Sequence, residues 1–300
     1  SYNTAMGFQA GLAVTTGVQN TFVGGLSGDA TTTANSNAAF GYGSLGANTT
    51  GAQNVALGSG ALFSNTTASN NTAVGLNTLL ANTTGTENVA VGSYALDANT
   101  TGDNSVAVGV YALSTQNPAS NADMHNTAVG YKAGLSVTTG KQNTLIGAQA
   151  GDAITTGENN TIIGWLAGTH AINLSTGGNN TLVGSYTDTT AVDTTAAVVL
   201  GYNVTGEGGY TTVGDSTNDI RAAHGTATWA AVSDQRYKKD IVDSTAGLSF
   251  INALQPRTFK YKTLGELPET FNAYEADSTE VFKNSNTNHG FIAQEIKAAI

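Results

Sequence analysis

The amino-acid sequence predicts a mainly β protein, in which a parallel β-solenoid of 17-residue repeats is followed by a small α+β domain. Glycine recurs every 17 residues, an apolar residue stands before each of those glycines, and the composition changes abruptly after Arg221. A fixed period of this length is typical of stacked coils that each form one rung. We expect the solenoid to cover residues 1–220, a linker to cover 221–232 and the second domain to cover 233–300.

The glycine period is regular apart from two longer steps. The repeat glycines are Gly7, Gly24, Gly41, Gly58, Gly75, Gly92, Gly109, Gly130, Gly147, Gly164, Gly184 and Gly201. One long step of 21 residues starts at Gly109 and contains Pro118, and another of 20 residues starts at Gly164. Because proline cannot donate a hydrogen bond to a strand ladder, we expect the extra residues to form loops.

The residues before each repeat glycine are predicted to form a short strand. An apolar residue precedes the glycine, Thr or Val usually stands two positions earlier, and Ala is commonest between them, as in Val89-Ala90-Val91. β-Branched residues favour an extended chain. Because strand side chains alternate, the two flanking residues share one face and the alanine points to the other. Both faces are apolar, which predicts cover on both sides.

The two faces are expected to be covered from different sources. A second strand of the same coil is predicted at Ala61-Leu62, Ala95-Leu96 and Ala112-Leu113, and it would cover one face. We expect the alanine face to meet other chains, since small side chains let backbones approach closely and three chains can close around an axis. The sequence therefore predicts a homotrimer.

Two further columns are predicted to stabilise the corners of each coil. Asparagine stands four residues before most of the repeat glycines, and we expect these amides to bond to one another from rung to rung. The T-T-G triplet at the other corner is predicted to supply a glycine with positive φ. These corner glycines are Gly17, Gly51, Gly85, Gly102, Gly140 and Gly157.

The residue pattern of the repeat, N-x-x-A-x-G-x-x-A, resembles that of the head repeats of trimeric autotransporter adhesins. That resemblance implies a trimeric left-handed parallel β-roll. With one rung per repeat, twelve rungs at about 4.8 Å give a shaft of roughly 58 Å.

Charge and composition exclude several classes of partner. Residues 1–220 hold two lysines against twelve acidic residues, a net charge of −10, whereas residues 221–300 hold nine of each sign. An acidic shaft lacks the basic stripe that nucleic acids and anionic membranes require. The chain has no stretch near 18 apolar residues, which argues against membrane insertion. The absence of cysteine and the wide spacing of the four histidines predict no metal, and we expect no cofactor.

Three ordered blocks follow residue 232. The first block, S-D-x-R-x-K-x-x-I, consists of Ser233, Asp234, Arg236, Lys238 and Ile241. The second is L-S-F-I-N-A-L-Q-P-R-T-F-K-Y-K, from Leu248 to Lys262, and the third is G-F-I-A-Q-E, with Gly290, Gln294 and Glu295. In motif and order these blocks resemble the intramolecular chaperone domain of phage tail fibres and tailspikes, peptidase family S74.

The resemblance implies a domain that trimerises, aligns the shafts and then cuts the bond between Val232 and Ser233. It also implies that Ser233 is the nucleophile, that Lys238 is the general base, and that Asp234 and Arg236 hold the motif's geometry. A serine hydroxyl needs an adjacent base, and lysine can serve when burial lowers its pKa. Ser233 and Asp234 are also a typical helix start, and both readings can hold together. The family's domain normally continues past the third block, so a truncated domain is expected.

The sequence therefore favours a tail-fibre segment in the virion, assembled in the host cytoplasm, with self-cleavage as its expected chemistry and no turnover on an external substrate. Expected partners are further copies of the chain, a host cell-surface glycan or protein, and upstream tail components. Tyr111, His125 and Trp165 form the predicted receptor patch. The alternatives are a bacterial trimeric surface adhesin and a glycan depolymerase, which would need paired carboxylates, whereas the acidic residues of the shaft are scattered.

Overall fold

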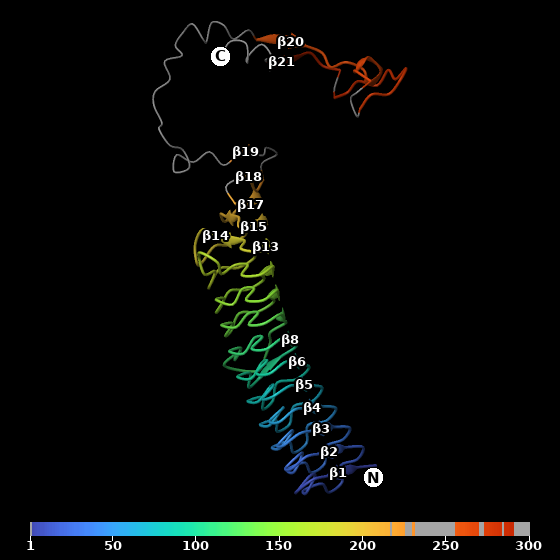
Figure 1. Ribbon diagram of the computed structural model, residues 1–300, viewed down its shortest axis with the longest axis vertical. Coiled ribbons are helices and arrows are strands. Elements are labelled where there is room, and N and C mark those ends of the chain that lie inside the picture. Colours follow the sequence, from blue (N-terminus) through green and yellow to red (C-terminus); the bar gives the residue numbers. More distant parts are fainter. Residues whose placement is uncertain are drawn as a thin grey trace. The chain divides into compact units, whose positions relative to one another are not determined.

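The computed structural model describes residues 2–216, 218–225, 230–231, 256–269, 273–283 and 285–290. The chain divides into two compact units, Ser1–Ser233 and Asp234–Ile300. The first unit is a rod of stacked coils, with one short strand above the next along its length (Figure 1).

One strand per repeat contributes to a 15-stranded sheet. In pairing order the strands are β1 (Thr4–Met6), β2 (Thr21–Val23), β3 (Ala38–Phe40), β4 (Val55–Leu57), β5 (Thr72–Val74), β6 (Val89–Val91), β8 (Val106–Val108), β10 (Thr127–Val129), β11 (Thr144–Ile146), β12 (Thr161–Ile163), β13 (Thr181–Val183), β15 (Val198–Tyr202), β17 (Tyr210–Asp215), β18 (Asn218–Ala223) and β19 (Ala230–Ala231). Pairing from β1 to β17 is parallel, which confirms the predicted β-solenoid with one rung per repeat.

The two long repeat steps leave the main sheet in register. Strand β8 pairs with β10 and β12 pairs with β13 at the same repeat positions as in the regular rungs. Near the insertions lie two small parallel pairs, β7 (Gly102–Asp103) with β9 (Ala122–Asp123), and β14 (Asp188–Thr189) with β16 (Thr205–Gly206). The additional residues therefore lie outside the main sheet, although Ala122–Asp123 of the first insertion form a short strand and not the predicted loop.

The parallel ladder ends in antiparallel strands. Strand β17 pairs antiparallel with β18, and β18 pairs antiparallel with β19. Arg221 of β18 forms an ion pair of 2.9 Å with Glu207 and lies over the ring of Tyr210, 4.9 Å from its centroid. These contacts connect β18 to the last coil of the solenoid.

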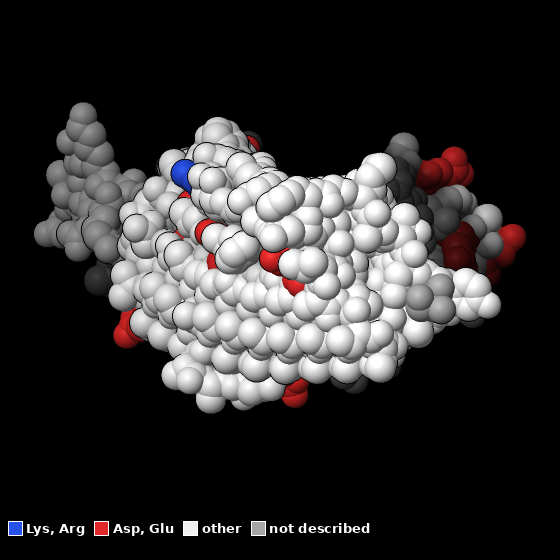
Figure 2. All heavy atoms as spheres, turned by 90° about the horizontal axis from the view of Figure 1, so that it is seen from below, with Lys and Arg blue, Asp and Glu red and all other residues white. Residues whose placement is uncertain are grey.

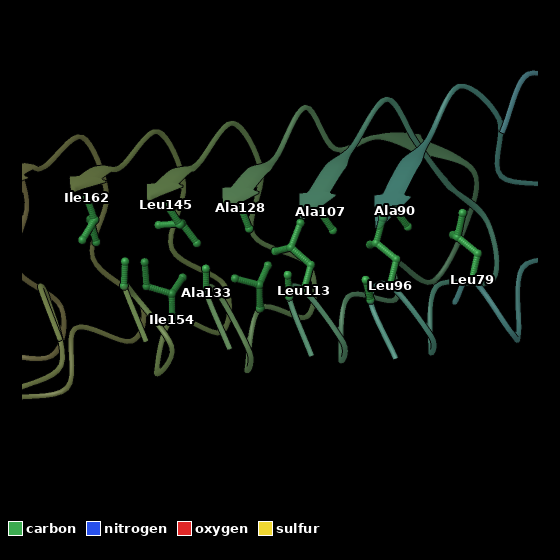
Figure 3. Packing of buried hydrophobic residues seen from close by; sticks show 14 of the residues in the cluster. Leu79, Ala90, Leu96, Ala107, Leu113, Ala128, Ala133, Leu145, Ile154 and Ile162 are labelled. Carbon is green, nitrogen blue, oxygen red and sulfur yellow. The ribbon is translucent and has the colours of Figure 1, made fainter. Parts of the chain in front are cut away.

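The strand alanines face the interior of their own coil, so the prediction that they meet other chains is wrong. Figure 3 shows Ala90 and Ala107 pointing toward Leu96 and Leu113, and all four side chains are buried. The alternation of the two faces was predicted correctly, but not which face lies inside. Leucines from the rest of the coil fill its interior and leave room only for a small side chain on the strand.

The segment after the repeat glycine is a run of turns and not the predicted second strand. The N–H groups of Ala61, Phe63 and Asn65 each donate to the carbonyl three residues earlier, at 3.2 to 3.3 Å. Leu62 has φ of 51°, and Leu96 has φ of 50°. Non-glycine residues rarely adopt this left-handed conformation, and here it accompanies burial of the leucine side chain.

Some rungs carry the small core residue on the strand and the large one in the turns, and other rungs have the reverse arrangement. Five rungs with a strand alanine carry leucine four positions after the glycine, as at Leu96, whereas Leu145 and Ile162 lie in rungs with Gly151 and Gly168 at that position. A Cβ atom on Gly151 would lie 2.8 Å from Leu145 Cδ2. Glycine therefore leaves the space that the larger strand residue fills.

The asparagine ladder is confirmed, although its main bonds join side chains to the backbone. The Oδ1 atom of Asn71 accepts the N–H of Asn88 at 3.0 Å, and its Nδ2 donates to the carbonyl of Gly85 at 2.8 Å. A second ladder, which the repeat pattern did not predict, lies beside it: the amides of Asn65 and Asn82 each donate to the preceding rung, at 2.8 and 3.0 Å. Both ladders are buried, so they satisfy polar groups inside the coil.

The corner glycines do not have the predicted positive φ. They are required instead by the close approach of two rungs, because a Cβ on Gly85 would lie 2.5 Å from the carbonyl oxygen of Gly102. Positive φ occurs two residues later, at Glu87 for example, with φ of 59°. The repeat glycine itself has both properties, since Gly92 has φ of 129° and its Cβ would lie 2.6 Å from Gly109.

The described part of the second unit contains a small antiparallel sheet. Strand β20 (Arg257–Phe259) pairs with β21 (Asn288–Gly290), and a one-turn 3₁₀ helix, η2 (Leu264–Glu266), follows β20. Phe259 and Tyr261 pack edge to face, with ring centroids 5.5 Å apart. Among the residues that the structure describes, no helix is long and apolar enough to cross a membrane.

Candidate functional site

Most of the predicted processing residues fall outside the described residues. They are Val232, Ser233, Asp234, Arg236, Lys238, Ile241, Gln294 and Glu295. The backbone of Gly290 is described, and it ends β21 opposite Arg257. The roles of Ser233 as nucleophile and Lys238 as base therefore remain predictions.

The three residues of the predicted receptor patch lie in different surroundings. Tyr111 stacks on Tyr94, with ring centroids 5.2 Å apart and planes inclined by 9°. Trp165 lies against Tyr186 instead, with centroids 4.9 Å apart. His125 is exposed, and in the described part of the chain no ring contact joins it to either group. A shared role of the three in receptor binding stays a prediction.

Four rings gather beside the 20-residue repeat step, and we call this group the aromatic corner. Tyr186 is central, with centroid distances of 4.9 Å to Trp165, 4.4 Å to His170 and 5.8 Å to Tyr202. Of these four residues only Trp165 was predicted from the sequence, because the other rings come from an insertion and from the next two rungs. A signal was present, since Trp165, Tyr186 and Tyr202 all stand one or two positions after a repeat glycine.

A buried carboxylate supports the loop that supplies His170. The Oδ2 atom of Asp188 accepts the N–H groups of Ala171 at 2.6 Å and Ile172 at 2.8 Å, and its Oδ1 accepts the N–H of Thr189 at 2.9 Å. Only 1% of Asp188 is exposed. Because a buried charge is costly unless hydrogen-bonded, these amides stabilise the carboxylate while the carboxylate fixes the loop.

The outward side of the main sheet lacks charge along the whole solenoid. This outer sheet face consists of the first and third residues of β1–β6, β8, β10–β13 and β15, and all of them are Thr, Ala, Val, Ile, Leu, Met or Phe. Val55 is 40% exposed and Leu57 48% exposed in a single chain. Water-facing strand positions are usually polar and often charged, so an uncharged and mostly apolar face of this extent is typical of an interface.

The charges of the shaft lie elsewhere on the coils. In the view of Figure 2 most of the surface belongs to uncharged residues, and the acidic ones are scattered. Asp97 lies in the turn segment, where burial raises its pKa although backbone amides oppose the shift. Within the described residues, no three His, Cys, Asp or Glu side chains lie together in a way that could hold a metal ion.

One pair of carboxylates is brought together by the first insertion. Asp103 and Asp123 are register partners in the β7–β9 pair, a proximity that their sequence separation did not indicate. Asp103 is only 8% exposed and accepts hydrogen bonds from Thr86, while Asp123 accepts one from Asn104 at 2.6 Å. Glycan hydrolysis requires both carboxyl groups to face the substrate, which a buried Asp103 does not favour.

Comparison with known proteins gives one match, and it lies at the C-terminal end of the chain. Residues 233–300 match the family described as chaperone of endosialidase. The match confirms the resemblance drawn from the three sequence blocks. No curated protein and no solved structure matches the chain.

Proposed function

We propose, on the premise that residues 233–300 are a chaperone-of-endosialidase domain, that residues 1–220 form the shaft of a homotrimeric phage tail fibre and that residues 221–232 join the two. Such a domain next to a β-solenoid fits a protein of the tail-fibre or tailspike type. The observation that carries the proposal is the uncharged, partly exposed outer sheet face. Further copies of the same chain would cover it.

Electrostatics favours this face as the contact between copies. Residues 1–220 bear a net charge of −10, so three aligned shafts repel one another wherever acidic residues meet. The outer sheet face contains no charged residue. Its burial would contribute about 25 cal/mol for each Å² of apolar surface removed from water. Because all rungs are in register, every rung would make the same contact around a closed threefold axis.

The oligomeric mass of the shaft released by cleavage tests this interface, because the C-terminal domain, which is itself expected to trimerise, is then absent. We expect a mass of three chains by sedimentation, and we expect Val89→Lys to abolish the trimer because it places three ammonium groups near the axis. Thr67→Lys adds the same charge at an exposed corner outside the outer sheet face and should leave the trimer intact. A monomeric wild-type protein, or a trimeric Val89→Lys variant, would contradict the proposal.

Cleavage before Ser233 is the second part of the proposal. Neutral Lys238 would accept the hydroxyl proton as Ser233 Oγ attacks the Val232 carbonyl, and would return it to the departing Ser233 nitrogen. The acyl group moves from nitrogen to oxygen, and water then hydrolyses the ester. A fragment that ends at Val232 is the expected product by mass spectrometry.

Neighbouring residues of the same type provide controls for cleavage. Ser233→Ala and Lys238→Ala should leave the chain uncut, whereas Ser244→Ala and Lys239→Ala should be processed normally. Unchanged cleavage in Ser233→Ala would exclude that serine as the nucleophile. A cut at another bond would instead move the boundary of the shaft.

The shaft would belong to the virion, after assembly in the host cytoplasm, with upstream tail components at one end and a host-surface glycan or protein as its receptor. Binding of the purified shaft to host cells tests the attachment role. The depolymerase alternative is less favoured because the one adjacent carboxylate pair found in the described residues, Asp103 and Asp123, includes a buried member. Oligosaccharide release from surface polysaccharide would reverse that preference.

A further inference from the structure

We propose that the aromatic corner binds a neutral sugar unit of a cell-surface glycan, an inference that rests on the proposed attachment role. The corner consists of Trp165, His170, Tyr186 and Tyr202. In the described part of the shaft this is the largest group of rings in contact, and it lies beside the 20-residue step of the repeat. Insertions in solenoids commonly lie on the binding face.

The rings are inclined to one another and leave apolar faces open. The plane of Tyr186 makes angles of 58° with Trp165, 61° with His170 and 82° with Tyr202. In a single chain, Trp165 is 49% exposed and Tyr202 54% exposed. The Tyr94–Tyr111 pair, by contrast, lies nearly flat, ring on ring. Inclined, half-open rings form a corner against which a small cyclic ligand can pack on two sides.

The corner is built on a rigid frame. The N–H of Tyr186 donates to the carbonyl of Trp165 at 3.0 Å, so two of the rings come from directly bonded rungs. The loop that carries His170 is tied to Asp188 by two amide hydrogen bonds. A site that is fixed before binding loses little conformational entropy when a ligand arrives.

The chemistry of the corner matches a neutral sugar. Aromatic rings offer an apolar face for the C–H groups of a pyranose, while the exposed His170 imidazole can donate to or accept from a hydroxyl group. The two lysines of residues 1–220, Lys132 and Lys141, are not part of the corner, so an acidic sugar would find no lysine partner there. A protein receptor would need a contact surface of about 800 Å², far more than four rings provide.

Binding to immobilised lipopolysaccharide and capsular polysaccharide preparations tests the proposal. We expect Trp165→Ala and Tyr202→Ala to weaken binding of the assembled shaft to a neutral polysaccharide by about tenfold or more. Tyr42→Ala is the matched control, because Tyr42 also stands directly after a repeat glycine and is 63% exposed but makes none of the described ring contacts. It should bind like the wild type.

The outcomes separate this site from the attachment role in general. If the shaft binds host cells and the two corner variants bind equally well, the corner is not the site, although attachment stands. Binding only to a protein, or equal loss in Tyr42→Ala, also overturns the sugar proposal. Loss of the trimer in Trp165→Ala would show that the rings are contacts between chains. A shaft that binds neither cells nor polysaccharide would contradict both proposals.

Discussion

At the scale of single residues, the rungs are stabilised by uncharged groups at fixed repeat positions. Asn71 accepts from the next rung, donates to Gly85, and has its own N–H bonded to Asn54 Oδ1 at 3.0 Å. Gly92 allows a backbone conformation and an approach that no other residue allows. Each rung therefore depends on a few side chains whose replacement leaves groups unpaired or forces rungs apart.

Replacement of Asn71 by alanine tests the amide ladder. The change leaves the buried N–H of Asn88 without its partner, whereas the carbonyl of Gly85 keeps the amide of Asn82 at 3.0 Å, so we expect a cost of about 1–3 kcal/mol in the free energy of unfolding. Thr67→Ala, at an exposed position of the preceding rung, should cost less than about 0.5 kcal/mol. Equal effects in denaturant titrations would show that the ladder is not a major source of stability.

Two glycines with different environments test the close approach of the rungs. Gly92→Ala combines an unfavourable φ with a clash against the next backbone, and we expect a loss of about 3 kcal/mol or more in unfolding free energy. A Cβ on Gly25 would only touch the Tyr42 ring at 3.4 Å, so Gly25→Ala should change stability by less than about 1 kcal/mol. Thermal unfolding of the two variants gives the comparison.

Asp97 predicts a pH dependence of stability. Burial raises its folded-state pKa above 3.8, and in the described residues its Oδ1 atom has no hydrogen-bond partner. Between the unfolded-state pKa of 3.8 and the higher folded-state pKa, the folded protein binds more protons than the unfolded protein. The contribution of Asp97 to stability therefore falls as the pH rises through this window. Asp97→Asn should therefore raise the unfolding midpoint at pH 7, and the gain should shrink as pH falls toward 3.8.

Asp152→Asn is the matched control for that prediction. Asp152 occupies the same repeat position as Asp97, but its Oδ2 accepts a hydrogen bond from Gln149 at 3.2 Å. We expect no comparable gain in this variant. A pH-independent difference between wild type and Asp97→Asn would show that the carboxyl is not desolvated.

At the scale of the element, each coil is a short strand facing a run of turns, and their core residues are matched in size. Leu145 on β11 is accommodated by Gly134 and Gly151, whose Cβ atoms would lie 2.6 and 2.8 Å from its methyl groups. In rungs such as those of Ala90 and Ala107, a strand alanine faces leucines (Figure 3). The same backbone thus holds two packing arrangements of similar volume.

A double-mutant cycle tests this exchange. Gly151→Leu should destabilise by overpacking and Leu145→Ala by leaving a cavity, whereas the double variant restores the Ala–Leu arrangement of the other rungs. We expect the two changes to be coupled favourably by about 1–3 kcal/mol in unfolding free energy. Combining Gly151→Leu with Leu62→Ala, which lies several rungs away, should give additive effects. Additivity in both pairs would contradict the size-matching explanation.

At the scale of the whole molecule, the first unit is a linear stack in which each rung contacts its neighbours through identical registers. The stability of such a stack is close to a sum of rung and neighbour contributions. The outer sheet face runs along the same stack, so removal of one complete rung shortens both the core and the proposed interface without shifting either.

Deletion of one complete repeat should therefore be tolerated better than deletion of half of one. Removal of residues 69–85 joins two rungs with the same alanine–leucine core. We expect this variant to fold, with the same circular dichroism per residue as the wild type. Removal of 69–77 takes out the strand and leaves a half coil without a partner, although it deletes fewer residues. We expect it to be less stable by about 2 kcal/mol or more. The reverse order would argue against independent rungs.

The sequence predicted the period, the strand position and the asparagine ladder because these depend on local pattern. It did not predict which strand face lies inside, since both faces are apolar and the choice depends on leucines in left-handed turns, such as Leu96. The predicted processing motif could be recognised from the sequence because its residues lie close together along the chain. The aromatic corner was not, because Trp165 and Tyr202 become neighbours of Tyr186 only when the rungs stack.

The chain reversal between β17 and β18 has a consequence for self-association. A row of parallel strands ends in an edge on which another identical strand could continue the ladder, and such edges promote aggregation. Here the antiparallel strand β18 occupies that edge at the C-terminal end of the stack, fastened by Arg221 to Glu207 and Tyr210. Another rod therefore cannot add a parallel strand to β17 unless β18 is displaced first, which disfavours end-to-end joining of the rods.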